Sequence, residues 1–203
     1  TITLNRPEAM NSFTTEMAGE LVDVFNSASE DDGVGCIIVT GAGKAFCAGM
    51  DLSIEGNVFG LDESIRPNLD EIRDRYNDED MVAGVRDTGG RVSLAIFECK
   101  KPVIGAINGA AVGIGATMTL GMDIRMVSEK ARIGFVFGKI GVTPEACSTW
   151  FLPRIVGMQT ALEWVYSADI LNASQVVEAG LARSVHAPEE LLPAARELAL
   201  KFV

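Results

Sequence analysis

Histidine is almost missing from this sequence, since His186 is the single example among 203 residues. A zinc site of the His-Glu-x-x-His type therefore cannot form, and a Ser–His or Cys–His nucleophile would need His186 as its base. His186 lies where a short predicted strand runs into a turn, and at such a place a surface role is more common than catalysis. This scarcity removes many acid–base mechanisms.

Paired cysteines are missing as well. The four cysteines are far apart and form no C-x-x-C motif: Cys36, Cys47, Cys99 and Cys147. A metal-binding knuckle or a disulfide framework is therefore not expected, and we predict no metal site. Cys47 lies in a loop, but no obvious base is near it, so we interpret it as a packed small side chain.

Basic residues are few, because 17 Lys and Arg stand against 28 Asp and Glu and give a formal net charge of −11. This balance excludes long-range attraction to nucleic acid or to an anionic membrane, although local Lys, Arg and backbone amides can still hold an anionic small ligand. No apolar run is long enough to span a bilayer and no signal pattern is present, so we expect a cytoplasmic protein. The 48% hydrophobic content fits one globular domain over residues 1–203.

Strands and helices alternate along the chain, which predicts an α/β fold. Buried strands are expected at 36–39 and 103–107. The expected helices cover these ranges: 13–28, 91–99, 116–122, 158–167, 174–179 and 189–202. Residues 54–90 are dense in charge and are predicted to form an exposed insertion. The run Thr143-Pro144-Glu145 has the pattern of a helix start, so Glu145 could serve simply as a first-turn acid.

Two loops of small residues follow the two buried strands, at 41–52 (GAGKAFCAGMDL) and 108–115 (NGAAVGIG). Neither is a nucleotide loop. A Walker-type loop would need Ser or Thr at Ala45, and the two dinucleotide fingerprints fail at Phe46 and Met118, where glycine is required. Each loop nevertheless offers backbone amides with no side chain in the way.

Four segments together resemble the crotonase (enoyl-CoA hydratase/isomerase) superfamily. They are 4–8 (LNRPE), 44–52 (KAFCAGMDL), 101–109 (KPVIGAING) and 152–154 (LPR). The resemblance implies a spiral of ββα units with peripheral helices, an acyl-CoA thioester as substrate, and a homo-trimer or hexamer. CoA would then be part of the substrate, so no separate cofactor is expected. Family members usually continue into further C-terminal helices, which we expect to be missing from this chain.

The resemblance gives the two loops a chemical role. In the family each loop contributes a backbone N–H to an oxyanion hole that holds the thioester carbonyl as it becomes an enolate. Carried over by position, these amides belong to Ala48 and Ile114, and the glycines at 49, 113 and 115 leave room for the carbonyl. Fixed donors of this kind are worth roughly 3 kcal/mol each.

The resemblance also implies where the ligand lies. CoA would follow the segment 46–52, with contacts at Phe46, Ala48, Gly49, Asp51 and Leu52. Lys44 is either a phosphate contact or a solvated loop lysine, and Asp51 is expected to fix the loop through backbone hydrogen bonds. The acyl group would lie against Gly113, Ile114, Phe137 and Trp150, although core packing explains these residues equally well.

Family members differ in the group that moves protons. Hydratases carry two glutamates at positions that here hold Thr117 and Phe137, which disfavours water addition by that route. Isomerases of fatty acid metabolism place one glutamate in a segment similar to 142–148, which indicates Glu145. A single base can take a proton from C2 of a 3-enoyl-CoA and return it at C4. We therefore predict Δ3,Δ2-enoyl-CoA isomerisation with Glu145 as the base.

Three other hypotheses stay open. The protein could be an enoyl-CoA hydratase (a lyase) with an atypical water-activating group. It could bind acyl-CoA without catalysis, because two carboxylates are missing and the third has a structural alternative. It could also be an α/β scaffold protein that has no CoA site.

Overall fold

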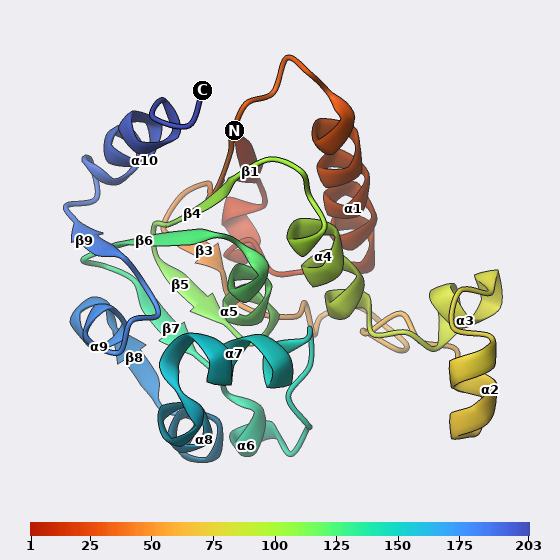
Figure 1. Cartoon of the computed structure of the whole chain (residues 1–203). Helices are drawn as coiled ribbons and strands as arrows, with labels where there is room; N and C mark the ends of the chain where they lie inside the picture. The colour runs from red at the N-terminus through yellow and green to blue at the C-terminus, as the bar shows by residue number, and fades with distance from the viewer.

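Nine short strands form two sheets in the computed structural model, which describes residues 1–203. The larger sheet contains β1 (Ile2–Leu4), β2 (Ile37–Gly41), β4 (Val103–Ile107), β6 (Ile124–Ser128) and β9 (Ser184–His186), in that order and all parallel. The smaller sheet contains β3 (Ala45–Cys47), β5 (Ala110–Val112), β7 (Arg132–Gly134) and β8 (Ile170–Asn172), with β8 antiparallel to β7. Both sheets are visible in Figure 1.

The chain passes repeatedly from the larger sheet to the smaller one. It does so from β2 to β3, from β4 to β5 and from β6 to β7, and each time a helical segment follows. The helices of the body are α1 (Thr15–Glu30), α4 (Thr88–Phe97), α5 (Ile114–Thr117), α6 (Phe137–Ile140), α7 (Ser148–Val156), α8 (Met158–Ser167), α9 (Ala173–Glu178) and α10 (Leu191–Ala199), with 3-10 turns η1 (Pro7–Ala9) and η2 (Met118–Gly121). This is the predicted spiral of ββα units with peripheral helices.

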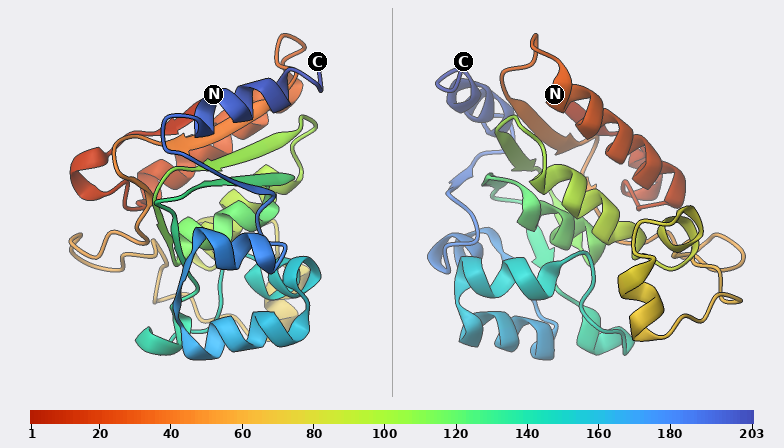
Figure 2. Two further views of the ribbon diagram at one scale, coloured as in Figure 1. Left: turned by 90° about the vertical axis from the view of Figure 1, so that its left-hand side faces the viewer. Right: turned by 45° about the vertical axis from the view of Figure 1, so that its right-hand side comes forward.

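The larger sheet is buried on both faces, which explains the continuous apolar runs of its central strands. Successive side chains of a strand point to opposite faces. Ile37 and Val39 accordingly join the main core with α1 and α4, whereas Ile38 joins a smaller cluster under α10 with Leu191 and Ala195. Figure 2 shows α10 on one side of this sheet and α1 and α4 on the other.

The charged segment 54–90 holds two short helices, α2 (Leu69–Asp74) and α3 (Glu79–Gly84), before it reaches α4. Most of its residues are exposed, as predicted, and α2 and α3 project from the body of the molecule in Figure 1. None of the helices combines the length and apolar character needed to cross a bilayer.

The helix start predicted at Thr143 is wrong. The segment around Pro144 and Glu145 is not helical, and α7 begins only at Ser148. The reason is the backbone at Ala146 and Cys147, whose φ angles are +52° and +59°. Residues in this left-handed conformation cannot belong to a right-handed helix, so the structure rules out a first-turn role for Glu145.

The two small-residue loops contact each other through their backbones. A Cβ atom on Gly109 would lie 2.0 Å from the carbonyl oxygen of Lys44, and one on Gly115 would lie 2.0 Å from the carbonyl oxygen of Cys47. These contacts bring the loop after β2 and β3 against the loop after β4 and β5. Glycine is therefore required at both positions.

Gly115→Ala should destabilise the protein by at least about 2 kcal/mol, because the new methyl group meets a backbone carbonyl that cannot move without shifting β3. Gly19→Ala is the matched control. Gly19 lies within α1 and a Cβ there meets nothing within 4 Å, so this change should instead stabilise the protein by about 0.5–1 kcal/mol. Urea unfolding of both variants measures the difference, and equal stabilities would contradict the close contact at Gly115.

Candidate functional site

A cavity of about 200 Å³ lies where the two loops meet. Its walls come from four parts of the chain: the loop 48–52, the junction of β5 and α5 at 112–114, the start of α4 at 87–88, and the segment 136–145. Most of the lining is apolar, and Phe59 from the charged segment completes it. The segment that carries Glu145 and the two loops of small residues therefore face one cavity.

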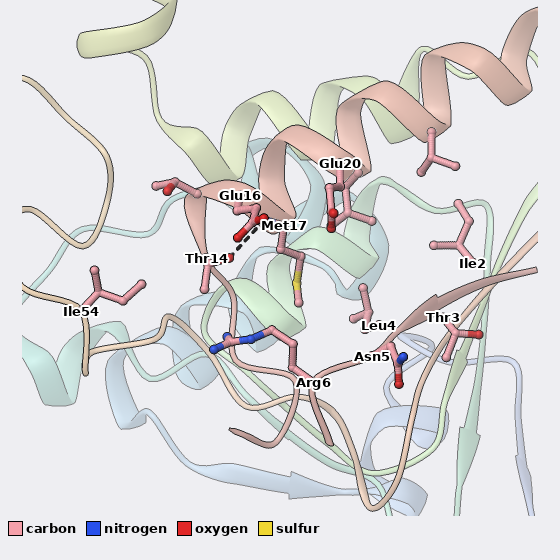
Figure 3. A pocket seen from close by; sticks show the side chains of 13 residues that line it. Ile2, Thr3, Leu4, Asn5, Arg6, Thr14, Glu16, Met17, Glu20 and Ile54 are labelled. Atoms are coloured by element: carbon pink, nitrogen blue, oxygen red, sulfur yellow. Dashed lines mark hydrogen bonds between the residues drawn. The ribbon is translucent and has the colours of Figure 1, made fainter. Parts of the chain in front are cut away.

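A larger cavity of about 490 Å³ lies elsewhere, between β1 and α1. Figure 3 shows it with Arg6 near the end of β1 and Glu16 and Glu20 on α1. Both glutamates are exposed, and the Arg6 guanidinium already pairs with Asp51 at 2.9 Å. This cavity holds no buried acid or base, so the smaller one is the candidate site.

Glu145 is the acid of the smaller cavity and is mostly buried. Burial raises the pKa of its carboxyl from 4.5 to about 7, the hydrogen bond from Thr117 opposes this shift, and the negative charge of Asp87 adds to it. Near neutral pH both the acid and the carboxylate are therefore populated. A group in this state can both accept and return a proton.

Thr117 holds one of the two carboxyl oxygens. Its Oγ1 donates to Oε1 of Glu145 at 2.8 Å and also lies 3.2 Å from the carbonyl oxygen of Gly113. When Glu145 is protonated, the carboxyl can donate to Oγ1, whose own proton then turns to Gly113. Thr117 is completely buried, so the arrangement serves both protonation states away from water. Oε2 of Glu145 is left free.

Ile114 lines the cavity and offers a backbone N–H there. It is the first residue of α5, and the N–H groups of Ala116 and Thr117 bond to the carbonyl of Gly113, whereas that of Ile114 has no acceptor. Gly113 makes the sharp entry to the helix with φ +54°. The Ile114 amide is therefore a free donor in the cavity wall.

The prediction that Ala48 provides the second free amide is wrong. Ala48 does line the cavity, but its N–H donates to the carbonyl oxygen of Met10 at 3.1 Å. The free amide belongs to Met50, two residues later. Phe13 donates to Gly49 O at 2.8 Å and accepts from Asp51 N at 2.9 Å, so the N–H of Met50 points away from Phe13 and has no acceptor.

Asp51 fixes the loop that carries Met50, but mainly through side-chain hydrogen bonds and not through the predicted backbone ones, of which only that from Ser53 N, at 3.1 Å, is present. Its carboxylate accepts hydrogen bonds from Ser53 Oγ at 2.6 Å, Arg6 Nη2 at 2.9 Å and Ser12 Oγ at 3.1 Å. The Ser53 hydroxyl and amide, followed by Arg6, hold the pKa of Asp51 far below its ordinary value. Asp51 therefore remains ionised and acts as an anchor of the loop.

The other predicted ligand contacts divide into two groups. Gly49, Leu52 and Gly113 line the cavity together with Ile114. Lys44 is exposed and lies outside the lining.

Three more of the predicted contacts lie outside the lining of the cavity. Phe46 and Phe137 are buried in the main core, so their side chains cannot reach a ligand in the cavity. Trp150 is 57% exposed, outside the lining, and its ring lies under the Arg154 guanidinium at 3.3 Å. In each case the aromatic side chain serves core or surface packing.

Sequence reasoning missed Met50, Phe59, Asp87 and Thr88. The last three belong to the charged segment, which gave no sign that it would turn toward the cavity. Asp87-Thr88-Gly89-Gly90 does contain a helix-cap signal, and the structure shows Asp87 capping α4. That signal locates a helix start and says nothing about a site.

The whole chain is similar to known proteins. The sequence model of a family described as enoyl-CoA hydratase/isomerase matches residues 1–203. An enoyl-CoA hydratase of Alternaria alternata is 38% identical over 199 residues, which are 98% of this chain and 61% of that relative. A 1,2-epoxyphenylacetyl-CoA isomerase of Escherichia coli K12 is 35% identical over 199 residues, with 98% and 70% covered. The chain thus spans less than two thirds of the Alternaria relative.

Solved structures agree with the fold. A monofunctional enoyl-CoA isomerase from M. smegmatis has a TM-score of 0.75 at 26% identity and covers 98% of this chain and 78% of its own. An enoyl-CoA hydratase from Bacillus anthracis has a TM-score of 0.81 at 29% identity, with 98% and 70% covered. Relatives of both activities therefore resemble this chain.

Glu145→Gln should stabilise the protein at high pH. The pKa of Glu145 is raised to about 7 in the folded protein. The free energy of unfolding therefore falls as the pH rises from the pKa of the unfolded chain to the pKa of the folded protein. Glutamine escapes this loss, so the variant should be more stable by up to about 3 kcal/mol at roughly pH 8, with no gain near pH 4. Urea unfolding across pH measures this, and a gain that does not depend on pH would contradict the raised pKa.

Proposed function

Because the chain belongs to the enoyl-CoA hydratase/isomerase family, we propose that it catalyses Δ3,Δ2 isomerisation of an enoyl-CoA thioester with Glu145 as its single base. The observation that carries the proposal is the meeting of three groups in one cavity. Glu145, with a pKa of about 7, faces the same space as the free amides of Met50 and Ile114. This set suits a reaction that moves a proton while negative charge collects on a carbonyl oxygen.

In the proposed reaction the thioester oxygen accepts hydrogen bonds from the amides of Met50 and Ile114. Oε2 of Glu145 takes a proton from C2, and the electron pair of that C–H bond passes into a dienolate that extends from the oxygen to C4. The same oxygen of Glu145 then returns the proton to C4. The double bond ends between C2 and C3, the carbonyl is restored, and no co-reactant is consumed.

Thr117 suits this one-base reaction. It holds Oε1 of Glu145 at 2.8 Å, so Oε2 alone is available for both proton transfers. Thr117 and Phe137 also occupy the two positions where hydratases that this chain resembles carry glutamates. The residues at these positions provide no second carboxylate to activate water.

The thioester is proposed to enter along the loop 48–52. The exposed side chain of Leu52 lies beside the cavity, and Gly49 leaves the backbone accessible. The exposed Lys44 is proposed as a contact for the phosphates of CoA, and the apolar walls would hold the acyl chain.

Hydration of a 2-enoyl-CoA is a second candidate. It is favoured by the hydratase name of the Alternaria relative, which is 38% identical to this chain. In this cavity Glu145 alone would have to activate the water. The Escherichia coli relative is named as a 1,2-epoxyphenylacetyl-CoA isomerase.

Glu145→Gln should abolish migration of the double bond, with a loss of about 10²–10⁴-fold in kcat for a 3-enoyl-CoA. Binding of the thioester should persist, because the amides of Met50 and Ile114 are unchanged. Double-bond migration and water addition are followed side by side by NMR, with a 3-enoyl-CoA and a 2-enoyl-CoA as substrates. The exposed Glu189 provides the matched control, Glu189→Gln, which should behave as the wild type.

The outcomes separate the hypotheses. Hydration that survives in Glu145→Gln would overturn the one-base proposal and indicate a different water-activating group. Thioester binding without turnover by the wild type would indicate a non-catalytic acyl-CoA-binding protein. Absence of any thioester binding would leave only the scaffold hypothesis.

A further inference from the structure

Asp87 connects α4 to the segment that carries Glu145. Its Oδ1 accepts from the N–H of Gly89 at 3.0 Å, and its Oδ2 accepts from Gly90 at 2.9 Å and from Ala146 at 2.7 Å. The first two bonds cap α4 in the ordinary way. The third bond crosses 59 positions of sequence to the residue after Glu145. A helix cap alone does not need it.

The backbone beside Glu145 needs such support. Ala146 and Cys147 both adopt left-handed conformations, with φ angles of +52° and +59°. This conformation is strained for a residue that has a Cβ atom, so it persists only where neighbouring contacts impose it. The side chain of Ala146 is fully buried in the main core, and its amide is held by Asp87. These two contacts fix the direction in which Glu145 leaves the loop.

The start of α4 also lies directly against the free oxygen of Glu145. A Cβ on Gly89 would be 2.6 Å from Oε2 of Glu145 and 2.5 Å from Cδ1 of Ile114. The first turn of α4 therefore bounds the space in which Oε2 meets the substrate. Any shift of the loop relative to α4 would move that oxygen against this boundary or away from it.

We propose that Asp87 is a positioning residue for Glu145, which clamps the Ala146 amide so that the free carboxyl oxygen Oε2 is held beside the two oxyanion amides. The inference rests on the proposed function in taking Glu145 as the base. It adds a residue whose two carboxylate oxygens both accept hydrogen bonds from backbone N–H groups. Asp87 positions the Glu145 carboxyl through the loop, and its negative charge acts on the pKa of that carboxyl through space.

The charge of Asp87 has a separate effect on protonation. Around Glu145, the groups that titrate or carry charge are Asp87 before α4 and Cys147 in the same loop, with Arg86 beyond Cys147. From α5 only the hydroxyl of Thr117 reaches the carboxyl, and Lys139 of α6 is turned to the carbonyl of Ala168. Asp87 raises the pKa of Glu145 and Thr117 lowers it. Removal of the Asp87 charge and removal of the Thr117 hydroxyl should therefore shift the pKa of Glu145 in opposite directions.

Two substitutions at position 87 separate the clamp from the charge. Asp87→Ser keeps a good cap for α4, but its shorter side chain cannot reach Ala146. Asp87→Asn can place its carbonyl oxygen where Oδ2 accepts from both Gly90 and Ala146, so it keeps the clamp and loses the charge. Thr117→Val removes the opposing hydroxyl with little change of shape.

Three measurements follow these variants in the full chain. They are amide hydrogen exchange at Ala146, the ¹³C titration of the Glu145 carboxyl (identified by its loss in Glu145→Gln), and the pH profile of isomerisation of a 3-enoyl-CoA. Asp87→Ser should speed exchange at Ala146 and reduce kcat about 10- to 100-fold with little change in KM, because a displaced base mainly affects the chemical step. Asp87→Asn should restore most of kcat and keep exchange slow.

The titration should move as the charges require. Asp87→Asn lowers the pKa of Glu145, so the acidic limb of kcat/KM moves to lower pH, whereas Thr117→Val moves it to higher pH. Unchanged kcat and unchanged Ala146 exchange in Asp87→Ser would overturn the proposal. If the wild type does not isomerise the 3-enoyl-CoA, the proposed function fails, while exchange and titration still decide whether Asp87 positions Glu145.

Discussion

The contact between two backbones at Gly115 is the constraint on which the site depends. The carbonyl of Cys47 lies where a side chain at Gly115 would have to be. This contact brings the ends of two successive ββα units together and places the amides of Met50 and Ile114 in one cavity wall. The loops can meet because they follow parallel strands, whose carboxyl ends lie at the same edge of a sheet. Hydrogen bonds at Asp51 and Gly113 then orient the two amides.

The acid of the site lies on a loop, and its environment is built by neighbours. Burial makes the carboxylate of Glu145 costly, Thr117 offsets part of that cost, and Asp87 increases it. The result is a carboxyl that changes protonation state near neutral pH. The backbone after Glu145 is left-handed at Ala146 and Cys147, and the side chain of Asp87, from the start of α4, holds the Ala146 amide.

The sequence predicted the fold well and the site partly, and the differences have physical causes. Buried strands and glycine-rich loops have local signatures, so these elements were predicted from the residues, whereas the spiral of ββα units and the shared role of the two loops came from the family resemblance. The loop forms backbone hydrogen bonds with Met10 and Phe13, and these decide which of its amides is free. Such tertiary contacts cannot be read from the sequence, so the donor was predicted at Ala48 instead of Met50. Thr143-Pro144 has the chemistry of a helix start, but the left-handed backbone at Ala146 has no signature in that residue type. Asp87 lies in a run of charges where no single carboxylate stands out.

The cavity draws its apolar lining and its reactive groups from different pieces of chain. Phe59 lies before α2, and Ile140 and Val142 flank the end of α6, whereas the amides and Glu145 belong to other segments. All three apolar side chains are partly exposed at the cavity, so a change in their size need not disturb the core. Under the proposed function, substrate preference and chemistry can therefore diverge separately in evolution: a new acyl group would be accommodated by altering peripheral segments while Glu145 and the two amides are inherited unchanged.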